Sequence, residues 1–495
     1  MLFNSFNFIV FCLIVVMVYF IMPHKIKYIW LLGASYYFYM CWNPKYSLLI
    51  ILSTAITFLS GILLGKDDLT QKNLRRCVMA ATILLNLGML VVFKYGNFIV
   101  SNINQISRGM GWGSLSALDI LLPVGISFYV FQGLGYTIDV YRRETVPEKN
   151  FFRYALFISF FPQLVAGPIE RSGRLLCQLK EMDKRRMWSY SSIAEGFIGT
   201  LWGFFLKVVI ADRLAIFVDC IWNEYRNYGT IMLMLAAIGF SLQIYCDFSG
   251  YSAIAIGVSK IMGIEIMQNF NTPYFARSIK EFWQRWHISL STWFKDYLYI
   301  PLGGNRCSEI QNYCNLLTTF LLSGLWHGAG WNFVIWGALH GLYQIAGRLL
   351  KPLKKTIYSV FHFKTDTVGW RMGECLTTFL MVTFAWIFFR SESFTEACSF
   401  IHQMIFNNDI DRIAEAGMYG IDWGRLQGGV LLLSLTLLII VSLIRKFRNQ
   451  TIDVFLMEQP LLFRWAGIIL ILFMILIYGA YGREFDAQQF VYFQF

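Results

Sequence analysis

Charged residues are scarce in this 495-residue chain: they make up 15% of it, whereas hydrophobic residues make up 57%. A soluble domain carries about 25% charged and roughly 45–50% apolar residues. The chain also lacks a repeat of fixed period, and its mean hydropathy is +0.52. These features exclude a disordered chain, a coiled coil and a collagen-like fibre. They indicate a polytopic membrane protein, in which the many Phe residues suit hydrocarbon and Trp and Tyr suit the membrane interfaces.

Motifs of several common catalytic and metal centres are missing. The ten cysteines form no Cys-x-x-Cys pair, and no His-x-x-x-His or His-Glu-x-x-His spacing occurs. The sequence therefore gives no support for a zinc or redox site, and we expect no bound metal. There is also no Gly-x-Ser-x-Gly elbow, so a serine triad cannot be inferred.

Basic residues exceed acidic ones and give a net charge of +12. In a soluble protein this excess would suggest nucleic acid as a partner, but here the basic residues lie in short loops between apolar runs. We therefore expect cytoplasmic loops and contacts with anionic membrane lipids, and no nucleic-acid partner. The loop 391–428 has six acidic and two basic residues, and is expected on the outer side.

Ten apolar runs are long enough for a membrane span, which needs about 20 residues. They lie near residues 1–22, 26–42, 46–64, 77–100, 118–140, 193–222, 229–258, 376–389, 429–444 and 461–481. The first run has no basic start and no cleavage site, so we predict a retained span. Ten crossings place both termini outside the cytoplasm, in a multi-pass protein of the cell (cytoplasmic or inner) membrane. Two further stretches, 151–170 and 315–347, are broken by Pro or Gly and are candidate re-entrant or site-lining segments.

Three of the six histidines, His287, His327 and His340, fall close together in the sequence. His327 lies inside an apolar stretch with glycines on both sides. An imidazole can take and return a proton near neutral pH, and ionisable groups at membrane depth commonly face a cavity. The alternative for His327 is a histidine that is hydrogen-bonded to a carbonyl group between helices, and the alternative for His287 is an interfacial residue that behaves like an aromatic one.

A second set of polar residues also falls within apolar runs. Its members are Asn86, Asp139, Lys207, Asp212, Gln243 and Asp247. Paired acids and bases would fit a proton-coupled transporter or flippase, and they would also fit a static polar lining. No inverted internal repeat is apparent, which weakens the transporter hypothesis. A structural scaffold for an export complex is a further alternative.

Longer motifs resemble the membrane-bound O-acyltransferase family, and within it the bacterial branch typified by alginate O-acetyltransferases. The motifs are Asn269–Tyr274, Glu281–Tyr297, Tyr299–Arg306, Gly324–Phe333, Leu122–Phe128, Gly167–Arg171 and Tyr245–Ser252. The sister group that transfers D-alanine to teichoic acids lacks the Pro-Leu-Gly-Gly-Asn-Arg run at 301–306 and the Ala-Gly-Trp-Asn run at 329–332. Ala253 stands where the acetylating branch often has an acidic residue, which keeps D-alanyl transfer as an alternative.

The resemblance implies an all-α integral membrane protein. Its fold would be a ring of about 10–12 transmembrane helices around a central tunnel, with re-entrant segments. The whole chain, 1–495, would form one polytopic domain, with 259–347 as its catalytic core segment. The activity implied is O-acyl transfer, with acetyl-CoA or another acyl thioester as the donor and no permanently bound cofactor.

The resemblance also assigns roles to residues. His327 matches the family's catalytic histidine and would act as general base, and His287 matches the second family position, where it would orient the hydroxyl or stabilise the oxyanion. The donor's phosphates would be steered by Arg285, Lys295 and Arg306. The rings that would line a dry pocket are Trp286, Trp326 and Trp331.

The aromatic C-terminal tail, 486–495, resembles aromatic endings with a Tyr that occur in this family and in small partner proteins of its D-alanyl branch. The resemblance implies an intermediate acyl carrier outside the membrane. Tyr492 would receive the acyl group first, because a phenol of pKa about 10 leaves more readily than a sugar alcohol. A separate extracytoplasmic transferase with a nucleophilic serine, of the SGNH type, would then pass the group to a polysaccharide. An interfacial aromatic anchor is the alternative role for this tail.

Overall fold

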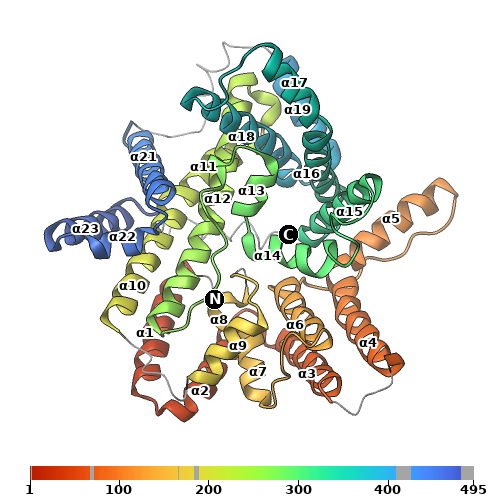
Figure 1. Cartoon of the computed structure of the whole chain (residues 1–495), viewed down its shortest axis with the longest axis vertical. Coiled ribbons are helices and arrows are strands. Elements are labelled where there is room, and N and C mark those ends of the chain that lie inside the picture. Colours follow the sequence, from red (N-terminus) through yellow and green to blue (C-terminus); the bar gives the residue numbers. More distant parts are fainter. Residues whose placement is uncertain (2, 67–71, 166, 183–188, 408–424, 481–495) are drawn as a thin grey trace. The chain divides into compact units, whose positions relative to one another are not determined.

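The computed structural model describes residues 1, 3–66, 72–165, 167–182, 189–407 and 425–480 (Figure 1). These residues form helices and contain no strand, which confirms the predicted all-α membrane class. Within these described ranges, six helical stretches are long and apolar enough to cross a membrane: Pro44–Leu64, Lys72–Gly109, Thr230–Ile261, Val368–Arg390, Gln427–Arg448 and Leu461–Tyr478. The chain is therefore a multi-pass membrane protein, whereas the total of ten crossings and the side of each terminus stay predictions.

The described residues divide into two compact units, and the first comprises Met1–Thr200 and Ser252–Met267. Its helices are α1 (Phe6–Ile21), α2 (Lys27–Met40), α3 (Ser47–Leu64), α4 (Lys72–Leu90), α5 (Gly96–Gly109), α6 (Ile126–Tyr141), α7 (Phe151–Ser159), α8 (Phe161–Leu164), α9 (Ser172–Glu181) and most of α10 (Tyr190–Phe204). Short turns η1 (His24–Ile26) and η2 (Pro44–Tyr46) and a π-helical segment η3 (Val91–Tyr95) connect some of them. Hydrogen bonds between buried side chains join α3 to α4. In one of them, the Ser53 hydroxyl donates to Asn86 Oδ1 at 2.7 Å.

The second unit comprises Leu201–Tyr251 and the chain from Gln268 onward. Its helices are α11 (Asp212–Asn223), α13 (Ile279–Arg285), α14 (Ile288–Phe294), α15 (Glu309–His327), α16 (Trp331–Leu349), α17 (Lys351–Val360), α18 (Val368–Arg390), α19 (Phe394–Phe406), α21 (Arg425–Arg448), α22 (Ile452–Glu458) and α23 (Leu461–Tyr478). It also holds η4 (Phe205–Ala211) and η7 (Lys295–Tyr299), which are π-helical, and the turns η5 (Tyr225–Asn227) and η6 (Pro273–Phe275). The long helix α12 (Thr230–Ile261) contributes residues to both units.

Helix breaks fall where the sequence places Pro and Gly. The stretch 151–170 divides into α7 and α8 at Phe160, and 315–347 divides into α15 and α16 at Gly328–Gly330, so both predicted breaks are confirmed. The span predicted near 118–140 is wrong over its first eight residues, because α6 begins only at Ile126. Pro123 has no N–H to donate, and Gly125 adopts a left-handed φ of 75° that does not belong to a helix.

Glycine allows α15 and α16 to approach closely. A Cβ atom built on Gly324 would lie 3.3 Å from the Cα atom of Gly337, and the reverse is also true. Both helices would have to separate if either residue carried a side chain. This crossing holds the end of α15, and with it His327, against α16.

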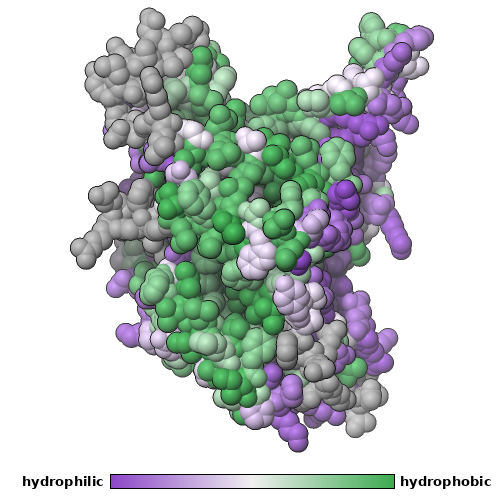
Figure 2. Space-filling view, turned by 90° about the vertical axis from the view of Figure 1, so that its left-hand side faces the viewer, coloured by the Kyte–Doolittle hydropathy of each residue, from purple (hydrophilic) through white to green (hydrophobic). Residues whose placement is uncertain are grey.

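Apolar side chains cover much of the surface, as expected where helices face hydrocarbon. Figure 2 shows them gathered over a broad area of the viewed face. Strongly exposed apolar residues occur on α1, α21 and α23, and include Leu13, Met17, Leu432, Ile439, Leu462 and Leu476. On a soluble protein such continuous exposure would be a liability, whereas in a bilayer it is the ordinary outer surface.

A glycine substitution tests the close packing within the first unit. A Cβ on Gly257 would lie only 2.7 Å from the backbone N of Thr200, whereas a Cβ on Gly88 would meet no atom within 4 Å. We expect Gly257→Ala to lower stability by about 1–3 kcal/mol through overpacking. Gly88→Ala should be neutral or stabilising by up to about 1 kcal/mol, since Ala is the better helix former. Thermal unfolding of the purified protein in detergent measures both, and equal midpoints would contradict this packing.

Candidate functional site

His327 is the last residue of α15, and aromatic rings enclose it. The backbone of Gly328 is extended and ends the helix directly after the histidine. The imidazole is buried, and its centroid lies 5.0 Å from Trp326, 5.0 Å from Trp336 and 5.4 Å from Phe389. An imidazole in such surroundings is held in one orientation by ring contacts.

His287 occupies a strained turn between α13 and α14. Its φ is 41°, a left-handed value that costs an ordinary residue of order 1–3 kcal/mol. Asn269 holds the turn: its carbonyl accepts from the N–H of Ile288 at 2.9 Å, and its side chain accepts from the Ser289 hydroxyl at 2.6 Å. Strain that is retained by such specific bonds commonly marks a functional position.

The fold brings the two predicted histidines together. Although His287 and His327 are 40 positions apart in the sequence, their ring centroids are 6.4 Å apart. The Trp326 ring contacts both, at 6.0 Å and 5.0 Å, and Phe248 of α12 covers His287 at 4.7 Å. His287 lies outside the candidate membrane-spanning helices, and burial lowers its pKa to about 3, so it is neutral at pH 7. A neutral imidazole can accept a proton and return it.

Aromatic residues that the sequence analysis did not single out complete the enclosure. Trp386 and Phe389 lie three positions apart on α18, so they share one helix face. Trp386 packs at 5.1 Å on Trp286 and at 5.5 Å on Trp336, and all three are buried. The spacing of Trp386 and Phe389 could have revealed a common face, but not the histidines that this face meets.

The predicted donor-binding residues fall into two groups. Trp286 and Trp326 are buried beside the histidines, whereas Trp331 opens α16 and is 57% exposed. Lys295 and Arg306 are exposed. Arg285 is engaged within the chain: it pairs with Glu281 at 2.8 Å and donates to Thr272 at 3.1 Å. Tyr492 lies outside the described residues.

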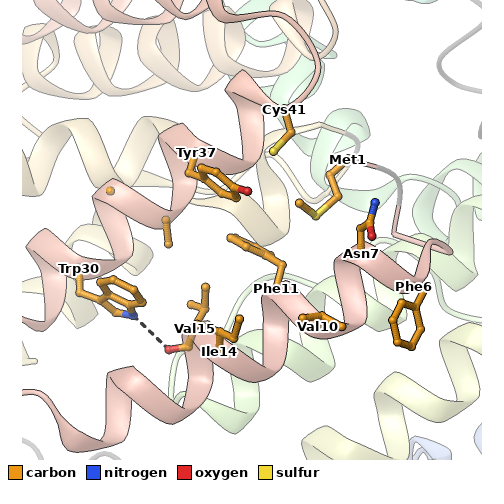
Figure 3. A pocket seen from close by; sticks show the side chains of 12 residues that line it. Met1, Phe6, Asn7, Val10, Phe11, Ile14, Val15, Trp30, Tyr37 and Cys41 are labelled. Carbon is orange, nitrogen blue, oxygen red and sulfur yellow. Dashed lines mark hydrogen bonds between the residues drawn. The ribbon is translucent and has the colours of Figure 1, made fainter.

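The first unit contains an apolar groove between α1 and α2. Its cavity volume is about 960 Å³, and the Trp30 indole donates to the Val15 carbonyl at 3.1 Å at its edge (Figure 3). The described lining consists of Met1, Phe6, Asn7, Val10, Phe11, Ile14, Val15, Trp30, Gly33, Ala34, Tyr37 and Cys41. This lining is mainly apolar and contains no histidine, so the groove suits hydrocarbon and not acyl-transfer chemistry.

Comparison with known proteins assigns the chain to a family. The model of the membrane-bound O-acyltransferase family matches residues 141–395, which include both histidines. The chain belongs to this family. It is therefore an O-acyltransferase.

Several known proteins are similar to this chain over most of their own length. The probable alginate O-acetylase AlgI of Pseudomonas aeruginosa is 37% identical over 88% of this chain and 80% of its own length. The peptidoglycan O-acetyltransferase of Helicobacter pylori is 36% identical over 77% of this chain and 74% of its own. The teichoic acid D-alanyltransferase of Bacillus subtilis is 30% identical over 54% of this chain and 67% of its own.

This O-acyltransferase also contains a buried ion cluster in its second unit. The Lys207 ammonium of η4 lies 2.8 Å from Asp212 and 2.6 Å from Asp247, and all three side chains are buried. Helix α12 approaches η4 closely at Gly250, where a Cβ atom would lie 3.2 Å from the backbone N of Lys207. Of the six intramembrane polar residues predicted from the sequence, three therefore form one structural cluster. Asp247 directly precedes Phe248, the ring that covers His287.

Removal of the Lys207 charge should destabilise the acyltransferase strongly. Lys207→Met would leave two carboxylates buried without this ammonium, and we expect a loss of about 3–5 kcal/mol. Lys260→Met is the matched control, since the Lys260–Glu195 pair is partly exposed and should contribute less than about 1 kcal/mol. Thermal unfolding in detergent checks both variants. If Lys207→Met melts no lower than the control, the cluster does not stabilise the fold in this way.

Proposed function

We propose that this enzyme moves an acetyl group from a cytoplasmic thioester, acetyl-CoA, to hydroxyl groups of a cell-surface or exported polysaccharide. The observation that carries the proposal is the enclosed pair of His287 and His327, with centroids 6.4 Å apart. The relatives support the acceptor class, because alginate and peptidoglycan, in the names of two of them, are both polysaccharides.

The chemistry follows from the two imidazoles. His327 acts as general base and takes the proton of an incoming hydroxyl, whose oxygen then attacks the thioester carbonyl carbon. His287 orients that hydroxyl. The surrounding Trp and Phe rings keep water away, which strengthens each polar interaction in the site and limits hydrolysis of the donor. Holding both reactants in one enclosed place also removes part of the entropic barrier.

The proposed membrane arrangement keeps the donor and the acceptor on opposite sides. A tunnel through the ring of helices would let the acyl group pass outward while its carrier stays in the cytoplasm. The exposed Lys295 and Arg306 would attract the donor's phosphates, and anionic lipids would contact the basic loops. Arg285, which is bonded to Glu281 and Thr272, would instead keep the turn beside His287 in shape.

The last step of the proposal involves a second protein. The acetyl group would pass to Tyr492 in the tail and then to an extracytoplasmic transferase with a nucleophilic serine. That partner would release the acetyl group onto the polysaccharide. An acyl-tyrosine remains activated because a phenol is a better leaving group than a sugar alcohol.

D-alanyl transfer is the second candidate. The similarity to the teichoic acid D-alanyltransferase is 30% over 54% of this chain, against 37% over 88% for the alginate relative. The wider and closer similarity favours acetyl. Purified protein supplied in parallel with labelled acetyl-CoA and with a D-alanyl carrier thioester tests the choice, and release of D-alanine alone would overturn the acetyl proposal.

Loss of the general base should abolish transfer. We expect His327→Ala to lower the rate of label transfer from acetyl-CoA by about 10²–10⁴-fold. His402→Ala removes an exposed histidine of α19 and should leave the rate unchanged. Both variants are compared at equal amounts of folded protein in liposomes. A fully active His327→Ala enzyme would reject the assignment.

The covalent role of the tail has its own test. Tyr492→Phe removes the acceptor oxygen and retains the aromatic ring, so we expect no acylated C-terminal peptide and no polysaccharide acetylation. Mass spectrometry of the tail peptide, trapped with donor present, measures the first effect. Polysaccharide acetylation at the wild-type level in Tyr492→Phe would show that the tail is only an anchor.

A further inference from the structure

His340 of α16 is held in one tautomer. The indole N–H of Trp283 donates to its Nδ1 atom at 3.2 Å. An indole nitrogen can only donate, so Nδ1 must be the acceptor. In the neutral imidazole the proton then resides on Nε2. His340 therefore presents a hydrogen-bond donor at Nε2, fixed by a neighbour that is itself buried.

That donor is enclosed and has no hydrogen-bond partner among the described residues. The His340 side chain is 0% exposed, with Phe282 stacked on it at 6.2 Å and Trp336 edge-on at 5.0 Å. A buried N–H group without a hydrogen-bond partner is unfavourable, and few are retained in folded proteins. Where one is retained, it commonly acts in catalysis or bonds to an ordered water or a ligand atom.

Two neighbouring rings have the same property. The indole N–H groups of Trp336 and Trp386 are buried and have no acceptor among the described residues. Trp386 packs on Trp336 at 5.5 Å and on His340 at 6.5 Å. Since imidazole Nδ1 is occupied by Trp283, this cluster offers donors and no free acceptor. What it lacks is an acceptor atom such as a carbonyl oxygen.

The cluster adjoins the proposed general base. The Trp336 centroid lies 5.0 Å from that of His327 and 5.0 Å from that of His340. The centroids of the two histidines can therefore be no more than about 10 Å apart, and one indole contacts both rings. An acyl group bound at this place would lie within reach of both.

We propose that His340 is a further catalytic residue, whose Nε2–H donates to the carbonyl oxygen of the acyl donor. The inference rests on the proposed function, in which a hydroxyl attacks a thioester. As the new C–O bond forms, the hydroxyl proton moves to His327 and the carbonyl electron pair moves to the oxygen held by His340. When that oxyanion collapses, the C–S bond breaks, and the sulfur leaves as a thiol with the proton that His327 returns. The Nε2–H group of His340 is in place before negative charge develops on the carbonyl oxygen, as oxyanion stabilisation requires.

Access to His340 requires a ring to move, because the imidazole is fully enclosed. The candidate is Trp336, which touches both histidines. Binding of the acyl thioester then changes the surroundings of at least one buried indole. Such a change alters indole fluorescence when the wild-type protein is titrated with acetyl-CoA.

Matched variants of the full-length protein test the role of His340. His340→Phe retains a flat ring and removes the hydrogen-bond donor. We therefore expect kcat to fall about 10²–10³-fold, with KM for the acyl thioester within about threefold of wild type. His340→Gln retains an N–H and should recover at least about tenfold over His340→Phe. Trp283→Phe frees Nδ1, allows both tautomers and should give an intermediate loss.

The control is Trp222→Phe. It also removes a buried indole N–H without a partner among the described residues, but Trp222 stacks on Phe400 at 4.1 Å in α19, and we expect full activity. Thermal unfolding establishes that each variant is folded. If His340→Phe does not fold, the comparison of His340→Gln and Trp283→Phe with wild type decides.

The outcomes separate the two proposals. Every acyl donor has a carbonyl oxygen, so the variants are measured with whichever thioester wild type consumes, acetyl-CoA or a D-alanyl carrier. The preference of wild type tests the proposed function, and the ratios between variants test His340. A kcat for His340→Phe within threefold of wild type overturns the inference, as does a His340→Gln enzyme no better than His340→Phe. If His340→Phe does not fold, wild-type kcat in both His340→Gln and Trp283→Phe also overturns it.

Discussion

The site depends on keeping two imidazoles in apolar surroundings at one place. Each is positioned by a local backbone feature: His287 by a left-handed turn that Asn269 holds, and His327 by the end of α15 at the extended Gly328. Neither feature would be stable alone. The turn is strained, and a helix end leaves carbonyl groups without intrahelical partners. Packing of α15 on α16 through glycine, and of α18 rings on both, stabilises the arrangement.

Buried charge imposes a second constraint on the same unit. Lys207, Asp212 and Asp247 are tolerated only because they satisfy one another at 2.6–2.8 Å. This pairing also determines how α12 lies against η4, where Gly250 allows the close approach. Phe248 follows Asp247 in that helix, so the ion cluster is next in sequence to a ring that covers His287.

The sequence predicts the class of fold and the two central histidines, and the reasons lie in local patterns. Long apolar runs, the glycines around His327 and the specific motif around His287 are all visible in a single chain. The partners Trp386 and Phe389 are not, because their contacts join residues about 60–100 positions apart, and only packing brings α18 to the histidines. Pairing of Lys207 with Asp247 was equally hidden, since each residue alone fits a transporter as well as a static cluster. Arg285 shows another limit of the sequence: its charge suggests ligand steering, and only the structure shows that Glu281, one helical turn away, pairs with it.

In the proposed reaction, the N–H groups of the aromatic enclosure would favour acyl transfer over hydrolysis of the donor. A site that activates a hydroxyl for attack on a thioester would also activate a water molecule, so the proposed reaction requires water to be excluded from the carbonyl group. Trp336, Trp386 and His340 present N–H groups without offering an acceptor to a water molecule, which favours an oxygen that has no proton of its own. A carbonyl oxygen meets that condition, whereas a water molecule needs partners for its protons as well. The aromatic enclosure that contacts His327 therefore also favours a carbonyl oxygen over a water molecule beside that histidine.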